Sequence, residues 1–230
     1  MVIALVRPHI EKSRSPRGLW VPFPLGRPLG EPEDPSFQRR VLLSALRLLE
    51  RAEGPVILED FADDAPSMRD NADWAPDPVL MRLPMSAPSD AAGWASALRA
   101  EMNEIQPHWQ AATHRFGRTT VGVSKLEPSR WPDYLAAWLS GTLPASPVAG
   151  LSAAVAMRFI ADDLKAMYSE AVQAHGPQPA AGQVQSWFWR STMAGALLRA
   201  IRGQSLTSAD SGFNTAGSRF VVPGPFVNPA

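Results

Sequence analysis

The chain has 230 residues, of which 45% are hydrophobic, and this is enough apolar material to form a buried core without disulfide or metal staples. It contains no cysteine, which excludes disulfide bonds, thiolate metal ligands, iron–sulfur clusters and a thiol nucleophile supplied by this chain. The 22 basic and 22 acidic residues balance, so no strong positive field attracts phosphate backbones. We therefore expect no nucleic-acid partner.

No apolar segment approaches the roughly 20 residues that a membrane-spanning helix needs. The apolar opening, residues 1–6, ends at Arg7-Pro8 before it reaches the length of a signal-peptide core. These features predict a cytoplasmic protein without a membrane partner.

The first third of the chain has the pattern of an α/β unit. Residues 2–6 predict a buried strand, and the proline- and glycine-rich residues 16–35 predict an ordered loop with a short edge strand at 19–23. A helix follows, with Asp34-Pro35 at its start, and a second strand is predicted at 55–58. The apolar positions of this helix recur with helical spacing and are Phe37, Val41, Leu42, Ala45, Leu48 and Leu49.

The rest of the chain has mainly helical periodicity. We predict a mixed α+β protein, with a small α/β unit at 1–85, a mostly helical, bundle-like domain at 86–203 and an extended C-terminal arm at 204–230. After residue 58 the predicted elements are an edge strand at 79–83, a helix from Ser89 that ends or kinks at Pro107, a strand at 118–124, and helices at 129–141, 150–174 and 183–202.

Two groups of residues in the α/β unit are candidates for ligand binding. Gly26, Arg27 and Gly30 precede a helix, where free backbone amides bind anions. Glu59 and Asp60 follow a predicted strand, at the edge of the sheet where α/β proteins bind ligands. The alternative is that glycine and proline only shape the loop and that the acids remain solvated or cap a turn.

A second candidate site combines carboxylates and a histidine from two predicted helices. Glu101, Glu104 and His108 lie close together on one helix, and Asp163 and Glu170 share a face of another. Facing carboxylates and histidines bind metals in helical bundles, so these five are the candidate metal ligands. Glu101, His108 and Asp163 are the candidate catalytic residues, and surface salt bridges are the alternative; one such bridge is predicted between Asp162 and Arg158.

Three aromatic residues, Trp187, Phe188 and Trp189, follow one another on a predicted helix and point in different directions. Trp187 and Phe188 are expected in the core. Trp189 points away from them, and we interpret it as an exposed contact for a partner. The residues do not identify a cofactor.

The stretch PRGLWVPFPLGRPLG at residues 16–30, followed by Asp34-Pro35, Gln38 and a helix rich in arginine and leucine, resembles the glycine/sarcosine/betaine and D-proline reductase B-component family. The resemblance covers about residues 2–60 and corresponds to the C-terminal portion of that family. It implies an α/β scaffold and a reductive cleavage of a carbon–nitrogen bond in a small amino acid, performed by a cysteine or selenocysteine. Since this chain has no cysteine, that group would have to come from a partner protein.

Three hypotheses for the function follow. The first is a component, or a divergent member, of a reductase-like system that acts on a small amino-acid-like molecule, with a thiol- or selenol-bearing protein as partner. The second is a non-catalytic binding or assembly protein, and the third is a metal-dependent enzyme of a helical bundle that uses carboxylates and histidine. A small-molecule ligand and homo-oligomerisation both stay open.

Overall fold

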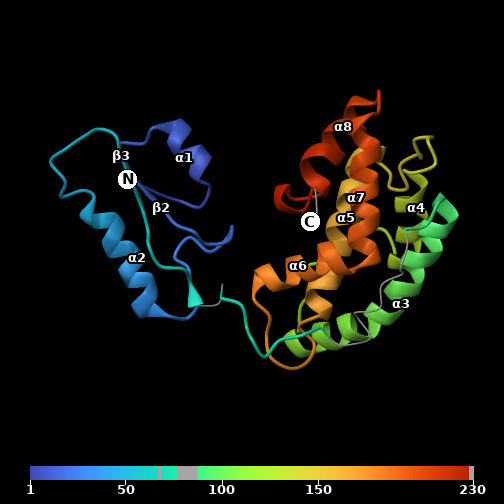
Figure 1. The fold of residues 1–230 in the computed structure, drawn as a ribbon, viewed down its shortest axis with the longest axis horizontal. Coiled ribbons are helices and arrows are strands. Elements are labelled where there is room, and N and C mark those ends of the chain that lie inside the picture. The colour runs from blue at the N-terminus through green and yellow to red at the C-terminus, as the bar shows by residue number, and fades with distance from the viewer. Residues whose placement is uncertain (67–68, 77–86, 228–230) are drawn as a thin grey trace. The chain divides into compact units, whose positions relative to one another are not determined.

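The computed structural model describes residues 1–66, 69–76 and 87–227. Backbone contacts divide the chain into two compact units, Met1–Asp70 and Asn71–Ala230, called here the N-terminal and C-terminal units (Figure 1). The N-terminal unit holds a small parallel sheet, and the C-terminal unit is helical, which confirms the predicted α+β class. The predicted boundary at residue 85 and the predicted strand at 79–83 lie outside the described residues.

The sheet consists of β1 (Val2–Ala4), β2 (Arg17–Trp20) and β3 (Ile57–Asp60), which are parallel and lie in the order β1-β2-β3. The strand predicted at the edge is therefore the central one, since β2 pairs with both neighbours. This is possible because β2 ends before Pro22, so proline removes no donor from the ladder. A short helix that the sequence analysis missed, α1 (Arg7–Ser13), connects β1 to β2.

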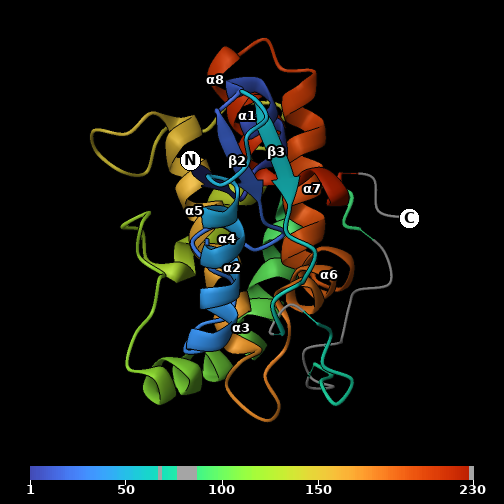
Figure 2. The ribbon, with the colours of Figure 1, turned by 90° about the vertical axis from the view of Figure 1, so that its left-hand side faces the viewer.

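Helices cover both faces of this sheet. On one face, Gly18 lies against Ile10 of α1, and a Cβ added at Gly18 would come within 2.5 Å of the Ile10 side chain. On the opposite face, Leu19 joins the apolar cluster made by α2 (Pro35–Arg47), because successive strand residues point to opposite sides. Figures 1 and 2 show α2 running beside the sheet.

Helix α2 begins as predicted but buries only part of its apolar surface. The Asp34 carboxylate accepts a hydrogen bond from the Phe37 amide at 2.9 Å, which confirms it as the N-cap. Leu42 and Leu49, which the helical spacing places in the core, are exposed by 43% and 56%. The prediction was wrong for these two leucines because the core of this small unit covers less than half of the helix circumference. The buried face consists of Phe37, Val41, Ala45 and Leu48.

The guanidinium group of Arg17 ties the end of α2 to the sheet. Its nitrogens donate to the carbonyl oxygens of Leu48 at 2.8 Å, Arg51 at 3.1 Å and Glu53 at 2.9 Å. These carbonyls lie at and beyond the helix C-terminus, where no helical donor reaches them. Gly54 is needed beside this group, because its φ is +107° and a Cβ there would come within 2.7 Å of Arg17 Nη1.

The C-terminal unit is built around a buried central helix, α5, which packs against five other helices. None of the helices in the described part of the chain is long and apolar enough to cross a membrane. The helices of this unit are α3 (Ala91–Phe116), α4 (Trp131–Ala137), α5 (Ala153–Ala171), α6 (Ala181–Ser191), α7 (Met193–Leu206) and α8 (Ser211–Ala216).

Three predicted elements of this unit differ from the structure. Helix α3 continues through Pro107 to Phe116, which excludes the first of the two predicted outcomes, an end or a kink at Pro107. Pro107 is exposed, so the carbonyl that loses its helical donor there faces solvent. Residues 118–124 form a loop and not a strand. The helix predicted at 183–202 is two helices, because Thr192 is extended and its hydroxyl caps α7 at the Gly195 amide.

The predicted C-terminal arm is folded into the helical unit. Residues 211–216 form α8, residues 217–221 form a π-helical turn and residues 224–226 form a 3-10 turn. Phe213 and Val221 are buried in the core, so apolar contacts hold this segment against the bundle instead of leaving it extended.

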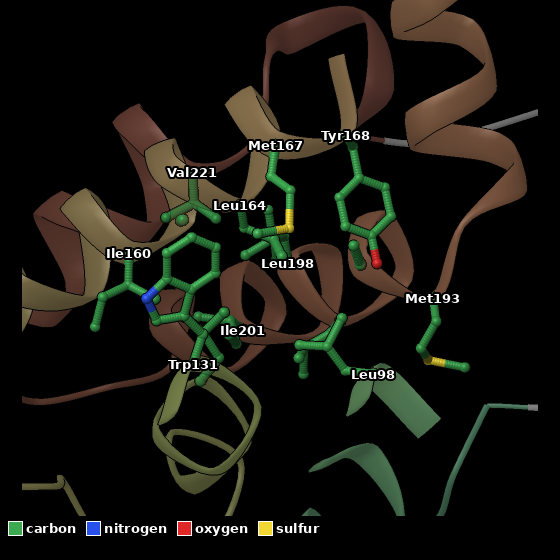
Figure 3. Close-up of a cluster of buried hydrophobic side chains, with 14 of the residues drawn as sticks. Leu98, Trp131, Ile160, Leu164, Met167, Tyr168, Met193, Leu198, Ile201 and Val221 are labelled. Carbon is green, nitrogen blue, oxygen red and sulfur yellow. The ribbon is translucent and has the colours of Figure 1, made fainter. Parts of the chain in front are cut away.

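Figure 3 shows how α3, α4, α5 and α7 contribute to one continuous core. The Tyr168 side chain enters this core and directs its hydroxyl toward the start of α7, where Met193 lies (Figure 3). The labelled core residues are Leu98, Trp131, Ile160, Leu164, Met167, Tyr168, Met193, Leu198, Ile201 and Val221.

Replacing Arg17 with methionine is expected to destabilise the N-terminal unit by about 2 kcal/mol, because charge-assisted bonds to several carbonyls are lost together. Hydrogen exchange of the amides at 48–60 measures the effect, and Lys12→Met, at an exposed position without a hydrogen bond to a described residue, is the control. Equal exchange rates in the two variants would contradict the assigned role of Arg17.

Candidate functional site

The carboxylate of Glu101, a predicted metal ligand on α3, instead binds the N-terminus of α7. It accepts hydrogen bonds from the amides of Met193 at 2.7 Å and Ala194 at 3.0 Å, and from the Tyr168 hydroxyl at 2.8 Å. Burial raises the pKa of Glu101, and the two amides and the hydroxyl partly oppose this rise. Burial and the neighbouring Glu101 also raise the pKa of Tyr168. This carboxylate therefore acts as a helix cap.

Asp163, the second candidate on α5, is 1% exposed and holds the loop that precedes α4. Its two oxygens accept hydrogen bonds from three successive amides, those of Gly122 at 2.8 Å, Val123 at 3.0 Å and Ser124 at 2.9 Å. These bonds explain why the residues predicted as a strand at 118–124 are a loop, since their donors point at a side chain and not at a neighbouring strand.

Glu170 fastens the other end of the same loop. Its carboxylate accepts hydrogen bonds from the Thr119 hydroxyl at 2.7 Å, from the amide and hydroxyl of Thr120 at 2.7 and 2.8 Å, and from Trp109 Nε1 at 2.8 Å. Burial by itself raises the pKa of Glu170, but these hydrogen bonds outweigh it, so that the pKa lies below its usual value.

The remaining candidate metal ligands, Glu104 and His108, do not form a metal site with these carboxylates. Glu104 is exposed, and the His108 ring lies 5.9 Å from the ring of His175. Within residues 1–66, 69–76 and 87–227, no group of three or more His, Cys, Asp or Glu side chains is placed to hold a metal ion. The structure thus gives these carboxylates structural roles: Asp163 and Glu170 hold one loop, and Glu101 caps α7. The predicted ion pair between Asp162 and Arg158 is confirmed, with Lys165 as a second partner of Asp162.

The predicted ligand-binding residues of the N-terminal unit form ion pairs or pack against other residues of the same unit. Asp60 pairs with Arg7, and Glu59 pairs with Arg51. Gly30 has a φ of +81°, and a side chain there would collide with the ring of Phe37. This close packing favours the structural interpretation of the glycines over phosphate binding.

Around this glycine, the rings of Phe23, Phe37 and Phe61 form a triangle with centroids 5.6 to 6.0 Å apart. The backbone of Arg27 takes part in two turns, as donor to Pro24 and acceptor from Gly30, both at 3.0 Å. Gly26 has a φ of +91° and open space around its Cα. The loop is thus an ordered pair of turns that packs against the aromatic cluster at Gly30.

Trp189 is 2% exposed, and its ring stacks on Phe226 with centroids 6.1 Å apart. The prediction of an exposed contact was therefore wrong, because the C-terminal segment folds back over the outer face of α6. Trp187 and Phe188 are buried, as expected.

The sequence analysis missed a groove in the C-terminal unit, between α3, α4 and α5. It has a volume of about 260 Å³, and the buried side chains of Met102 and Met167 contribute to its lining. The polar residues that line it are Arg99, Asn103 and Gln106 from α3 and Glu127 and Ser129 from the turn before α4. The available signal was the spacing of Arg99, Asn103 and Gln106, which places three polar side chains on one helix face.

The polar groups of this groove have few partners within the protein. Arg99 donates one hydrogen bond, from Nη2 to Asp133 at 2.7 Å, and so keeps other donors free. The side chains of Asn103, Gln106 and Glu127 make no hydrogen bond or ion pair with the part of the chain that the structure describes. A cation, an anion and two amides therefore line one groove beside two methionines.

Comparisons with protein-family models, with curated proteins and with solved structures found no match for this chain. The resemblance of residues 2–60 to the reductase B-component family accordingly stays a prediction from the sequence.

Replacing Asp163 with asparagine is expected to lower the free energy of unfolding of the C-terminal unit by about 3 kcal/mol, because a buried charge-assisted acceptor of three amides is lost. The neighbouring Asp162→Asn is the matched control and should change stability by less than about 0.5 kcal/mol, since its ion pairs are partly exposed to solvent. Urea unfolding followed by tryptophan fluorescence measures both. If the two variants were equally stable, the loop anchor would be refuted.

Proposed function

We propose that this protein is a non-catalytic, ligand-binding component of a reductase-like system, and that the groove between α3, α4 and α5 binds a small zwitterionic, amino-acid-like molecule. The observation that carries this proposal is that two side chains of opposite charge, Arg99 and Glu127, line the same groove beside apolar residues. A guanidinium group binds a carboxylate, and a carboxylate binds an ammonium group, so both ends of a zwitterion find a partner.

The size and the lining of the groove support a small ligand. A volume of about 260 Å³ lies just below the range of about 300–1,000 Å³ that is usual for drug-sized ligands. Met102 and Met167 offer an adaptable apolar surface for a short side chain. Asn103 and Gln106 supply further donors and acceptors that have no described partner.

The non-catalytic part of the proposal rests on the residues that the chain lacks or uses elsewhere. The sequence has no cysteine, and the resemblance of residues 2–60 implies chemistry that needs a thiol or selenol. A partner protein would supply that group. Glu101 and Asp163, the carboxylates considered for metal-dependent chemistry, already bind backbone amides, so we do not propose a metal enzyme.

Methionine methyl resonances test the groove directly, because Met102 and Met167 line it. Titration of the full chain with L-proline, glycine or sarcosine is expected to shift these two resonances, with a dissociation constant on the order of 1 mM for at least one of the three. Acetate and methylamine, which carry only one of the two charges, should bind at least about tenfold more weakly.

Variants separate the two charges. Arg99→Gln and Glu127→Gln should each weaken binding about tenfold, whereas Glu104→Gln, on an exposed part of α3 that does not line the groove, should leave it unchanged. The proposal fails if none of the three zwitterions shifts Met102 or Met167, or if the singly charged probes bind equally well.

A further inference from the structure

Helix α2 and the turn that follows it carry a second apolar surface, which the N-terminal unit itself leaves exposed. Its exposed side chains are large and close together, with exposed fractions of 43% for Leu42, 38% for Leu43, 48% for Leu46 and 56% for Leu49. We call these four residues the leucine stripe. Leu42 and Leu46 on α2 and Leu49 in the turn after it follow one another at helical spacing, each one residue after a residue of the core face, so they form a continuous ridge about 100° around the helix axis from that face. Clustered exposed leucines mark an interaction surface more often than scattered ones do.

The two ends of the leucine stripe carry opposite charges. Arg39 precedes Leu42 by one turn, and Glu50 follows Leu46 by one turn; both side chains are exposed. Neither makes a hydrogen bond or ion pair with a residue that the structure describes. Their neighbours differ in this respect, since Arg40 pairs with Asp63 and Arg51 pairs with Glu53. The leucine stripe therefore has an unpaired cation at its N-terminal end and an unpaired anion at its C-terminal end, where the exposed Arg47 lies on the flank of the stripe.

This distribution is self-complementary under a two-fold axis. We propose that the leucine stripe is the contact surface of a homodimer in which α2 of one copy packs antiparallel on α2 of the other. An antiparallel pairing brings the N-terminal end of each helix to the C-terminal end of the other, so Arg39 of each copy faces Glu50 of the other. A parallel pairing would place Arg39 opposite Arg39, and like charges there oppose association.

The choice of a second copy over another partner follows from the same charges. A two-fold interface uses one patch twice, so a patch with apolar residues in its centre and opposite charges at its two ends satisfies itself. An anionic lipid surface would attract Arg39 but repel Glu50. The antiparallel arrangement also sets the helix dipoles in opposite directions. The inference goes beyond the proposed ligand groove, which lies on other helices and takes no part in it.

Sedimentation velocity of the full chain over a range of concentrations tests the dimer. The contact is small, so we expect a reversible monomer–dimer equilibrium with a dissociation constant on the order of 10 µM. Leu46→Glu should weaken it at least about thirtyfold, because a carboxylate would be buried in the centre of the leucine stripe. Leu25→Glu is the matched control, since Leu25 is 77% exposed and lies outside the stripe, and it should leave the equilibrium unchanged.

Charge exchange tests the antiparallel geometry. Arg39→Glu and Glu50→Arg should each weaken the dimer about tenfold at low salt, and the double variant should restore it, because the pair is rebuilt with its signs reversed. Circular dichroism confirms that each variant is folded.

The proposal is overturned if the wild-type chain stays monomeric at every accessible concentration, or if the double variant is no better than the single ones. It is equally overturned if vesicles of phosphatidylglycerol and phosphatidylcholine bind the wild type and not Leu46→Glu, since the stripe would then be a lipid contact.

Discussion

Backbone amides that bind buried and partly buried carboxylates hold the helical unit in its shape. An ionised carboxylate inside a protein is costly unless several donors surround it, and a loop or helix start has amides without helical partners. Asp163 and Glu170 on the central helix accept hydrogen bonds from the unpaired amides of one loop. Glu101 accepts them from the unpaired amides at the start of α7. The loop before α4 and the corner between α6 and α7 both depend on these bonds.

Because these carboxylates bind amides and hydroxyls, they no longer support a metal site in the helical unit. Acidic residues at helical spacing suggested a metal centre, but their oxygens are already occupied by amides and hydroxyls. The side chains that keep unused hydrogen-bonding groups are ordinary surface residues. Arg99, which bonds only to Asp133, and Glu127 line the same groove, and Arg39 and Glu50 lie at the two ends of the leucine stripe. Unpaired polar groups, more than groups with shifted pKa values, are therefore the basis of the two proposed binding surfaces.

The helix starts were predictable where a local signal sets them. Asp34, which the sequence analysis placed at a helix start, accepts a hydrogen bond from an amide of the first helical turn, and such caps depend on a few neighbouring residues. Ser152 caps α5 in the same way, although the helix was predicted to begin at residue 150. The break at Thr192 was missed, although threonine is also a capping residue, because the apolar periodicity continues across it. The amides released by that break are bound by Glu101, which lies 92 residues away from Met193 in the sequence. No local pattern contains that interaction.

The sequence by itself determined the class of the fold, the absence of any thiol chemistry in this chain and the apolar character of each helix. These properties follow from composition and from short-range periodicity, which act within one or two turns of the chain. Only the tertiary structure decided which apolar face of α2 is buried, that Trp189 is covered by Phe226, and that Glu101 and Asp163 cap backbone amides. The physical reason is that burial and hydrogen-bond partners depend on segments far apart in the sequence, and these meet only when the chain has folded.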